Sequence, residues 1–340
     1  MKCEWQWSGY PMIGRRGIIL DLHDLHDAWP DLLHEAGINV LGIHNWSGSN
    51  QFSEKIDEIA AYVHSPEGSQ WMNRLQRLGI EVEYELHAMS WLLPRDLYSR
   101  YPEWFRMDEH GNRTPSANLC PSHEDALEMI RGNAVRLARL LPPTTERYYM
   151  WQDDNQPWCK CERCRSYSDS DQTLMVNNAI VEAIRTVRSD AKLSHLAYMH
   201  TLESPPQQVT PAEGIFLEIA GPIIHRHEHP NYADGSPEEL SRLRDDRKFV
   251  KALERNLQVF GAEDAQALDY WLDASFFSKW KKPAGELAFH EEQTADDIQF
   301  YRDMNIDSIS SFGVFLDREY FDRYGHPPVV QYGEILGRTK

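Results

Sequence analysis

The sequence predicts an α/β protein that forms a single (β/α)8 TIM barrel with long βα loops at its C-terminal face. Three observations support this fold class. Eight short apolar or β-branched segments alternate with longer segments of helical periodicity. The segments that follow several strands are long and polar, whereas the links from helix back to strand, such as HEAGIN and QRLGIE, are short. No Pro/Gly-rich linker or break in composition divides the chain.

The expected strands are short apolar or β-branched runs. They cover residues 17–23, 38–46, 80–91, 147–154, 193–200, 215–220, 265–273 and 308–316. Helices are expected between them, among others at residues 54–63, 124–141, 173–187 and 296–304. In the third of these helices, apolar residues recur near one face, at Leu174, Ala179, Ile180 and Ile184. Ser122 and Asp125 suggest a capping box at the start of the second.

An open, doubly wound sheet is the alternative to the barrel. Such sheets place a Gly-rich phosphate-binding turn after the first strand, and this chain has DLHDLHD there instead. We therefore expect residues 1–340 to form one barrel domain. Within it, residues 1–14 form an N-terminal extension and residues 156–172 a Cys-rich loop.

The charge and hydropathy of the chain exclude several classes of partner. The 340 residues carry a formal net charge of −18, and no stripe of Lys and Arg offsets it, so we expect no nucleic-acid binding. No apolar run is long enough for a membrane span, and the N-terminus lacks the apolar core of a signal peptide. A cytoplasmic location is expected. The sequence leaves open whether the chain forms a homo-oligomer.

Cysteines gather after the third and fourth expected strands. Cys159, Cys161 and Cys164 form a C-x-C-x-x-C motif, and Cys120 precedes the helix after the third strand. Because the loops after neighbouring strands meet on one face of a barrel, we expect these four thiols to bind a structural Zn²⁺ ion with no open coordination position. Reduced or disulfide-paired thiols and a catalytic metal are the alternatives. No organic cofactor is expected.

Acidic side chains stand at the ends of several expected strands, where barrels carry their catalytic residues. Asp153 and Asp154 end the fourth strand. Glycosidic bond cleavage usually requires two carboxyl groups, but adjacent residues of a strand point in different directions. We therefore expect the second catalytic carboxylate to be one that lies late in another strand. The candidates are Glu85, Glu218 and Asp273. A structural role for Asp153 or Asp154 is the alternative.

Histidine and aromatic residues lie near the same strand ends, where they would line a polar cleft. The histidines are His23, His44, His87 and His200. A metal hydrolase would place His-x-His on the first strand, but here His23 and His26 are three residues apart and would face opposite sides. Flat aromatic rings stack on the apolar faces of sugars, and the candidates for this role are Trp46, Trp151, Tyr270 and Trp271.

Four segments together resemble the family catalogued as domain of unknown function 4838. They are YELHAMSWLLP, PEWFRMDEHGNRTPSANLCPS, WQDDNQPWCKCERCR and LDYWLDASFFSKWKKP. The similarity extends from about the second strand to YGEIL near the C-terminus. Its most specific element is an Asp at a strand end followed by C-x-C-x-x-C, with a further Cys before the preceding helix. Many relatives have Asn-Asp and glycines at this place, whereas this chain has Asp153-Asp154 and then Asn155-Gln156-Pro157.

This resemblance implies a TIM barrel related to glycoside hydrolases and indicates Asp154 as the shared acid. We therefore expect a glycoside hydrolase that acts on a small glycoside or oligosaccharide by carboxylate acid/base catalysis. Two alternatives stay open from the residues. One is a metal-dependent hydrolase or isomerase on the same barrel, and the other is a catalytically silent carbohydrate-binding protein.

Overall fold

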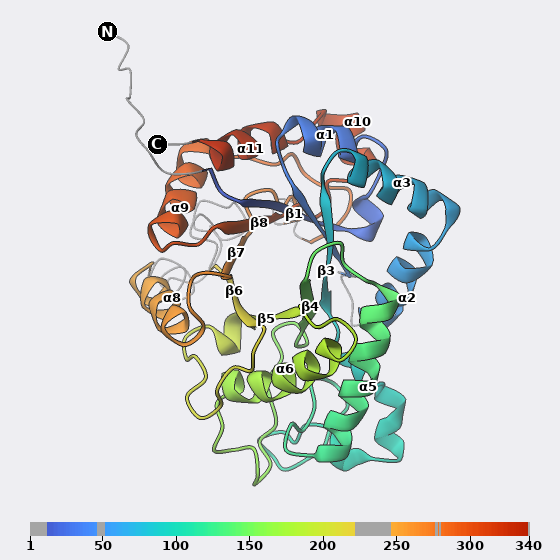
Figure 1. Cartoon of the computed structure of the whole chain (residues 1–340), viewed down its shortest axis with the longest axis vertical. Coiled ribbons are helices and arrows are strands. Elements are labelled where there is room, and N and C mark those ends of the chain that lie inside the picture. Colours follow the sequence, from blue (N-terminus) through green and yellow to red (C-terminus); the bar gives the residue numbers. More distant parts are fainter. Residues whose placement is uncertain (1–11, 46–51, 222–245, 276–277, 279, 339–340) are drawn as a thin grey trace.

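The computed structural model of the chain describes residues 12–45, 52–221, 246–275, 278 and 280–338. Eight parallel strands close into a barrel in sequence order, with β8 paired to β1 (Figure 1). The predicted (β/α)8 barrel is confirmed, and the open sheet is excluded. The strands are β1 (Arg15–Asp21), β2 (Val40–His44), β3 (Glu81–His87), β4 (Arg147–Trp151), β5 (Lys192–Ala197), β6 (Ile215–Ala220), β7 (Gln266–Asp269) and β8 (Ser308–Phe312).

Helices surround the ring of strands and bury their apolar faces against it (Figure 1). They are α1 (Trp29–Glu35), α2 (Phe52–Val63), α3 (Pro66–Arg77), α4 (Met89–Leu92), α5 (Glu124–Leu140), α6 (Asp169–Arg185), α8 (Asp246–Phe260), α9 (Glu291–Asp303), α10 (Arg318–Tyr324) and α11 (Val329–Gly337). The four apolar residues predicted on one face of α6 are all buried. This helix begins at Asp169, so the Cys-rich loop is shorter than the predicted 156–172.

The inside of the barrel is unusually polar for this fold. Residues paired in register across parallel strands face the same side, and one such row contains Asp21, His44, Glu85 and Tyr149. Side chains alternate between the two faces of a strand, so Glu83 and His87 face the interior as well. Two glycines make room for these groups. A Cβ on Gly42 would lie 2.6 Å from Glu85 Oε1, and one on Gly17 would lie 2.1 Å from Ser310 Oγ.

Most of the strands end earlier than predicted. The third expected strand stops at His87 and is followed by the helical turn α4, which carries Trp91. The fourth stops at Trp151, so Asp153 and Asp154 lie in the bend and turn after it. Apolar residues past these strand ends, such as Met89, Leu92 and Trp158, are also buried.

The capping box predicted at Ser122 and Asp125 is wrong. Helix α5 begins after His123, which makes no side-chain capping bond. Ser122 Oγ instead lies 3.1 Å from Cys164 Sγ. A complete capping box occurs at α6, where Ser168 and Asp171 each accept a backbone N–H of the other.

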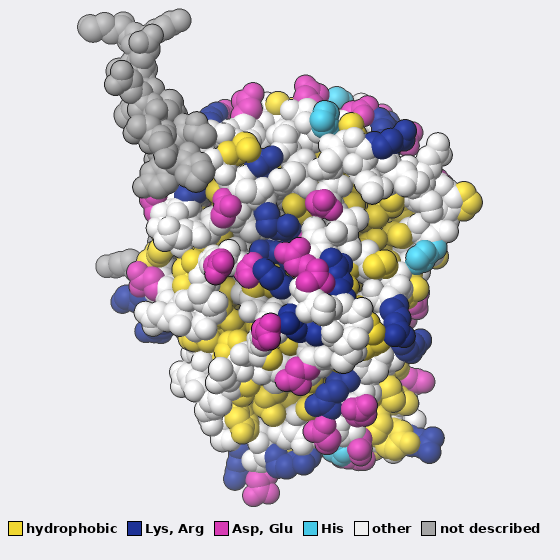
Figure 2. Space-filling model, in the orientation of Figure 1, with side chains coloured by type: hydrophobic (Ala, Val, Ile, Leu, Met, Phe, Trp, Pro, Cys, Tyr) yellow, Lys and Arg dark blue, Asp and Glu magenta, His cyan; other side chains and the backbone are white. Residues whose placement is uncertain are grey.

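Lys and Arg side chains alternate with Asp and Glu on the face of the molecule shown in Figure 2. The described ion pairs Arg147–Asp264 and Lys192–Asp264 join the starts of β4 and β5 to the segment before β7. None of the described helices is long and apolar enough to cross a membrane.

Candidate active site

A pocket with about 610 Å³ of space, including the part open to solvent, lies at the C-terminal ends of the strands. Its floor consists of inward-facing residues at the ends of seven strands, which are His44, His87, Trp151, Leu196, Ala220, Leu268 and Phe312. The remaining described lining comes from the segments after β4, β5, β7 and β8, with Asp154, Tyr198, Tyr270, Asp273, Trp280 and Val314.

Two carboxyl groups reach this pocket, and both were candidates from the sequence. Asp154 follows β4 and is half-buried, and Asp273 follows β7 and is buried. Asp273 Oδ1 accepts hydrogen bonds from the backbone N–H of Ser275 at 2.8 Å and from its hydroxyl at 2.5 Å. These two hydrogen bonds fix the start of the loop after β7.

Asp153 faces away from this pocket, although it is the neighbour of Asp154. Its Oδ2 accepts hydrogen bonds from the Arg95 guanidinium and from the backbone N–H of Asn118, each at 2.5 Å. Its own backbone N–H donates to Asn118 Oδ1 at 3.0 Å. Asp153 therefore joins the loops after β3 and β4, which is the structural alternative that the sequence left open.

His44 and His87 present fixed tautomers to the pocket. Their Nδ1 atoms bond to the carbonyl oxygens of Glu85 and Gln152. A carbonyl oxygen can only accept, so each Nδ1 carries a proton. Burial and the nearby His87 lower the pKa of His44 to about 3, so His44 is neutral at physiological pH.

Glu85 and Glu218 lie below the floor of the pocket and do not line it. Each is two residues before a floor residue of its strand, and both are fully buried. Glu218 Oε2 accepts a hydrogen bond from Trp151 Nε1 at 2.6 Å, and its Oε1 accepts one from Gln266 Nε2 at 3.1 Å. Burial raises the pKa of Glu218 to about 7. Burial and the charge of Glu218 raise the pKa of Glu85 well above its usual range.

Several residues predicted at the site lie elsewhere. His23 is exposed in the turn after β1, with its Nε2 3.0 Å from Lys55 Nζ. His200 is exposed and is not among the described lining residues. Trp271 points outward, where its Nε1 donates to Asp297 at 3.0 Å and its ring packs near Tyr301 and Tyr332. The reason is alternation, because its neighbour Tyr270 takes the inward position. Trp46 lies outside the described residues.

Sequence reasoning missed several lining residues. Phe312 could have been found from the period-two pattern of Ser308, Ser310 and Phe312, which places all three on one face of β8. Trp280 and Tyr198 lie in loops, where no periodicity indicates the direction of a side chain.

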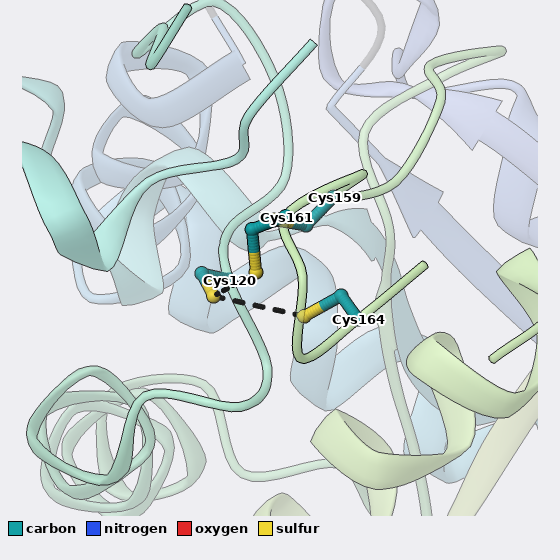
Figure 3. Close-up of side chains that lie close together, drawn as sticks. All are labelled: Cys120, Cys159, Cys161 and Cys164. Carbon is teal, nitrogen blue, oxygen red and sulfur yellow. Dashed lines mark hydrogen bonds between the residues drawn. The ribbon is translucent and has the colours of Figure 1, made fainter. Parts of the chain in front are cut away.

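The four predicted cysteines lie together (Figure 3). Cys120 comes from the loop before α5, and Cys159, Cys161 and Cys164 come from the loop before α6. Their sulfur atoms are buried, none forms a disulfide, and all lie within 4.8 Å of one another. Cys120 Sγ is 3.7 Å from Sγ of both Cys161 and Cys164.

This spacing fits a tetrahedral metal site. Four thiolates about 2.3 Å from a zinc ion have sulfur atoms roughly 3.8 Å apart. Further groups surround Cys159, whose sulfur lies 3.3 Å from the backbone nitrogen of Met107 and 3.7 Å from Arg113 Nη1. Gln172 of α6 also accepts the backbone N–H of Cys159. Among the described residues, no second group of His, Cys, Asp or Glu has ligand atoms this close together.

The fold is similar to solved glycoside hydrolase structures. The chain superposes on the β-galactosidase of the psychrophilic Marinomonas ef1 with a TM-score of 0.56 at 11% identity, covering 95% of this chain and 59% of that one. It superposes on a GH20 catalytic module of the pneumococcal exo-β-D-N-acetylglucosaminidase StrH with a TM-score of 0.51 at 8% identity, covering 96% and 83%. At such identities the likeness extends to the fold alone.

In sequence, no curated protein matches the chain. A family model described as "Domain of unknown function (DUF4838)" matches residues 50–260, which include β3 to β6, the cysteine cluster and Asp154. This match covers more than half of the chain. The protein is therefore a member of the DUF4838 family.

Proposed function

We propose that this protein is a glycoside hydrolase that acts on a small neutral glycoside or oligosaccharide. The observation that carries the proposal is that Asp154 and Asp273, from the loops after β4 and β7, line one pocket with aromatic rings. Two carboxyl groups across a pocket are what glycosidic bond cleavage requires. Asp154 acts as the general acid that protonates the leaving oxygen. Asp273, hydrogen-bonded by Ser275, is the second carboxylate.

Recognition of the sugar follows from the remaining lining. His44 offers Nε2 as a hydrogen-bond acceptor for a sugar hydroxyl, and His87 lines the same pocket from the neighbouring strand. The aromatic rings of Trp151, Tyr270 and Phe312 give the apolar surface on which a sugar ring stacks. No Lys or Arg is among the described lining residues, which favours neutral sugars over anionic ones.

The four cysteines have a separate role in this proposal. They hold a structural Zn²⁺ ion that braces the loops after β3 and β4, and Asp154 lies at the start of the second of these loops. Four thiolates leave no coordination position for water or substrate, so the bound ion supplies stability and no chemistry.

The test is a pair of isosteric variants, Asp154→Asn and Asp273→Asn, assayed against a panel of aryl glycosides and disaccharides. Each variant should fold, retain its metal and bind sugar, but lose about 10²–10⁴-fold in turnover. Glu103→Gln, at an exposed position, also removes one negative charge; it serves as the control for the change in charge and should retain full turnover. Near-full activity in either aspartate variant would contradict the proposed mechanism. Sugar binding by the wild type without turnover of any glycoside would indicate a binding protein.

A further inference from the structure

The loop between β7 and α9 holds an exposed tryptophan at the mouth of the pocket. Trp280 lines the pocket, yet half of its surface, 50%, is exposed. By contrast, the two large aromatic side chains of the floor, Trp151 and Phe312, are buried. Tryptophan contributes most to stability when it is buried, so a half-exposed ring contributes less to the fold.

The backbone of Trp280 adopts a conformation that bulky residues rarely take. Its φ is +59°, in the left-handed region that favours Gly and Asn. The turn is held by the Trp280 N–H, which donates to the Ser275 carbonyl at 3.0 Å. Ser275 is in turn bound by Asp273. The candidate carboxylate and the tryptophan are therefore connected through one residue.

Positive φ values occur at several positions next to the pocket lining. Of the six described non-glycine residues with positive φ, Trp280 lines the pocket, and Asn155, Met199 and Phe315 are sequence neighbours of lining residues. The other two, Asn118 and Asn305, are not next to the described lining. Strained conformations cluster at functional sites because the surrounding structure must hold them there. A strained and exposed tryptophan at a pocket mouth therefore indicates a role toward a ligand.

We propose that Trp280 is the stacking platform for a second sugar ring, so that the pocket takes the end of a neutral chain of at least two sugars. The inference rests on the proposed function and extends it to a substrate class. The barrel floor closes the pocket from below, so a sugar chain enters by its end. The terminal ring lies between Asp154 and Asp273, and the next ring stacks on Trp280. The bond that is cleaved joins these two rings.

The experiment measures sugar binding by calorimetry in the Asp154→Asn background, which prevents turnover. The probes are three pairs: glucose and cellobiose, galactose and lactose, and N-acetylglucosamine with N,N′-diacetylchitobiose. For at least one pair, the disaccharide should bind about tenfold more tightly than the monosaccharide, as one aromatic stacking contact predicts. Trp280→Gly should remove this difference and leave monosaccharide affinity within about twofold.

Melting temperature separates a binding role from a structural one. Trp280→Gly relieves the backbone strain, so its melting temperature should be equal to or above that of the parent protein. Trp280→Ala keeps the strain and should melt lower than Trp280→Gly, with the same loss of disaccharide preference. Asn305→Gly makes the same backbone change away from the pocket and should leave all sugar affinities unchanged.

Each unfavourable result has a distinct meaning. Equal affinity for both members of every pair, or a disaccharide preference retained by Trp280→Gly, would overturn the platform and leave the proposed function standing. A large fall in the melting temperature of Trp280→Gly would also overturn it, because the ring would then support the loop. Binding of none of the six probes would overturn the proposed function together with this inference.

Discussion

The indole N–H of Trp151 donates a hydrogen bond to Oε2 of Glu218, at 2.6 Å, and so ties the pocket wall to the polar interior of the barrel. The other oxygen of Glu218 is bound by Gln266, and Glu85 lies next to it from the opposite side of the barrel. The position of a pocket residue therefore depends on the protonation of buried carboxyl groups below it.

Stability should fall as pH rises through the range in which Glu218 titrates. Its pKa is about 7 in the folded protein, whereas an unfolded glutamate has a pKa of about 4.3. Between these values the folded state binds a proton that the unfolded state does not, so the free energy of unfolding decreases with rising pH and levels off above about 7. Glu218→Gln removes this titration. In urea unfolding at pH 4.5 to 8, the free energy of unfolding of this variant should fall less steeply with rising pH than that of the wild type. The difference in slope should be up to about 1.4 kcal/mol per pH unit.

The control for this experiment is Glu103→Gln, which removes one exposed negative charge. If the free energy of unfolding of Glu103→Gln depended on pH as weakly as that of Glu218→Gln, the change would be due to net charge. The buried carboxyl groups Glu218 and Glu85 would then not be its cause. Burial also raises the pKa of Asp21 to about 7, so the free energy of unfolding should still decrease somewhat with rising pH in every variant.

Asp153 and Asp154 should respond differently to the same substitution. Asp153→Asn weakens the charge-assisted bonds to Arg95 and Asn118, so we expect a loss of about 1–3 kcal/mol of stability. Asp154→Asn changes a half-buried residue of the pocket, and its stability should stay within about 0.5 kcal/mol of the wild type. Chemical unfolding of both variants measures this contrast. Equal losses would contradict the division of roles between the two aspartates.

Cys161→Ser should lower zinc content and stability together. Metal binding by thiolates is coupled to folding, so removal of one of four ligands should cost at least about 3 kcal/mol. Ser122→Ala removes a contact to Cys164 Sγ but keeps all four thiols, and should retain one zinc per chain. Elemental analysis of protein purified without chelators is the measurement. A wild-type value well below one zinc per chain would rule out the metal site.

Gly42→Ala should destabilise the barrel, because the new Cβ would lie 2.6 Å from Glu85 Oε1 and 2.9 Å from Ile19 Cγ1. A cost of about 1–3 kcal/mol is typical of such overpacking. Gly132 lies within α5 with nothing within 4 Å of a Cβ, so Gly132→Ala should stabilise the protein by about 0.5–1 kcal/mol. Thermal unfolding of the two variants compares them. A stable Gly42→Ala protein would show that Glu85 can move from its place.

The barrel could be predicted from the sequence because its signal is periodic and repeated. Eight strands and their helices each carry the same pattern, and errors at single boundaries do not change the topology. The cysteine cluster was predictable for a related reason. Neighbouring strands of a barrel bring the loops that follow them together, so Cys120 and the C-x-C-x-x-C motif had to meet once the strand order was known.

The pocket was harder to predict because its residues lie where periodicity ends. Tyr270 lines the pocket, whereas the next residue, Trp271, packs against helices. Likewise, Asp154 lines the pocket, whereas its neighbour Asp153 binds Arg95 and Asn118. Glu85 and Glu218 were expected late in their strands as catalytic candidates, but the sequence carries no measure of depth. It could not show that they lie below the floor of the pocket.

The connections between the loops after β3 and β4 limit how these loops can be replaced by evolution or engineering. Asn118 bonds to Asp153, Gln156 and Pro157, and Cys120 meets the thiols of the second loop. In most barrels the loops at the catalytic face vary independently, which is why one scaffold supports many chemistries. Here a graft that replaced only one of the two loops would leave unmatched thiols and buried polar groups in the other. The pair is exchangeable only as a unit, so directed evolution of this barrel should begin at the loop after β7.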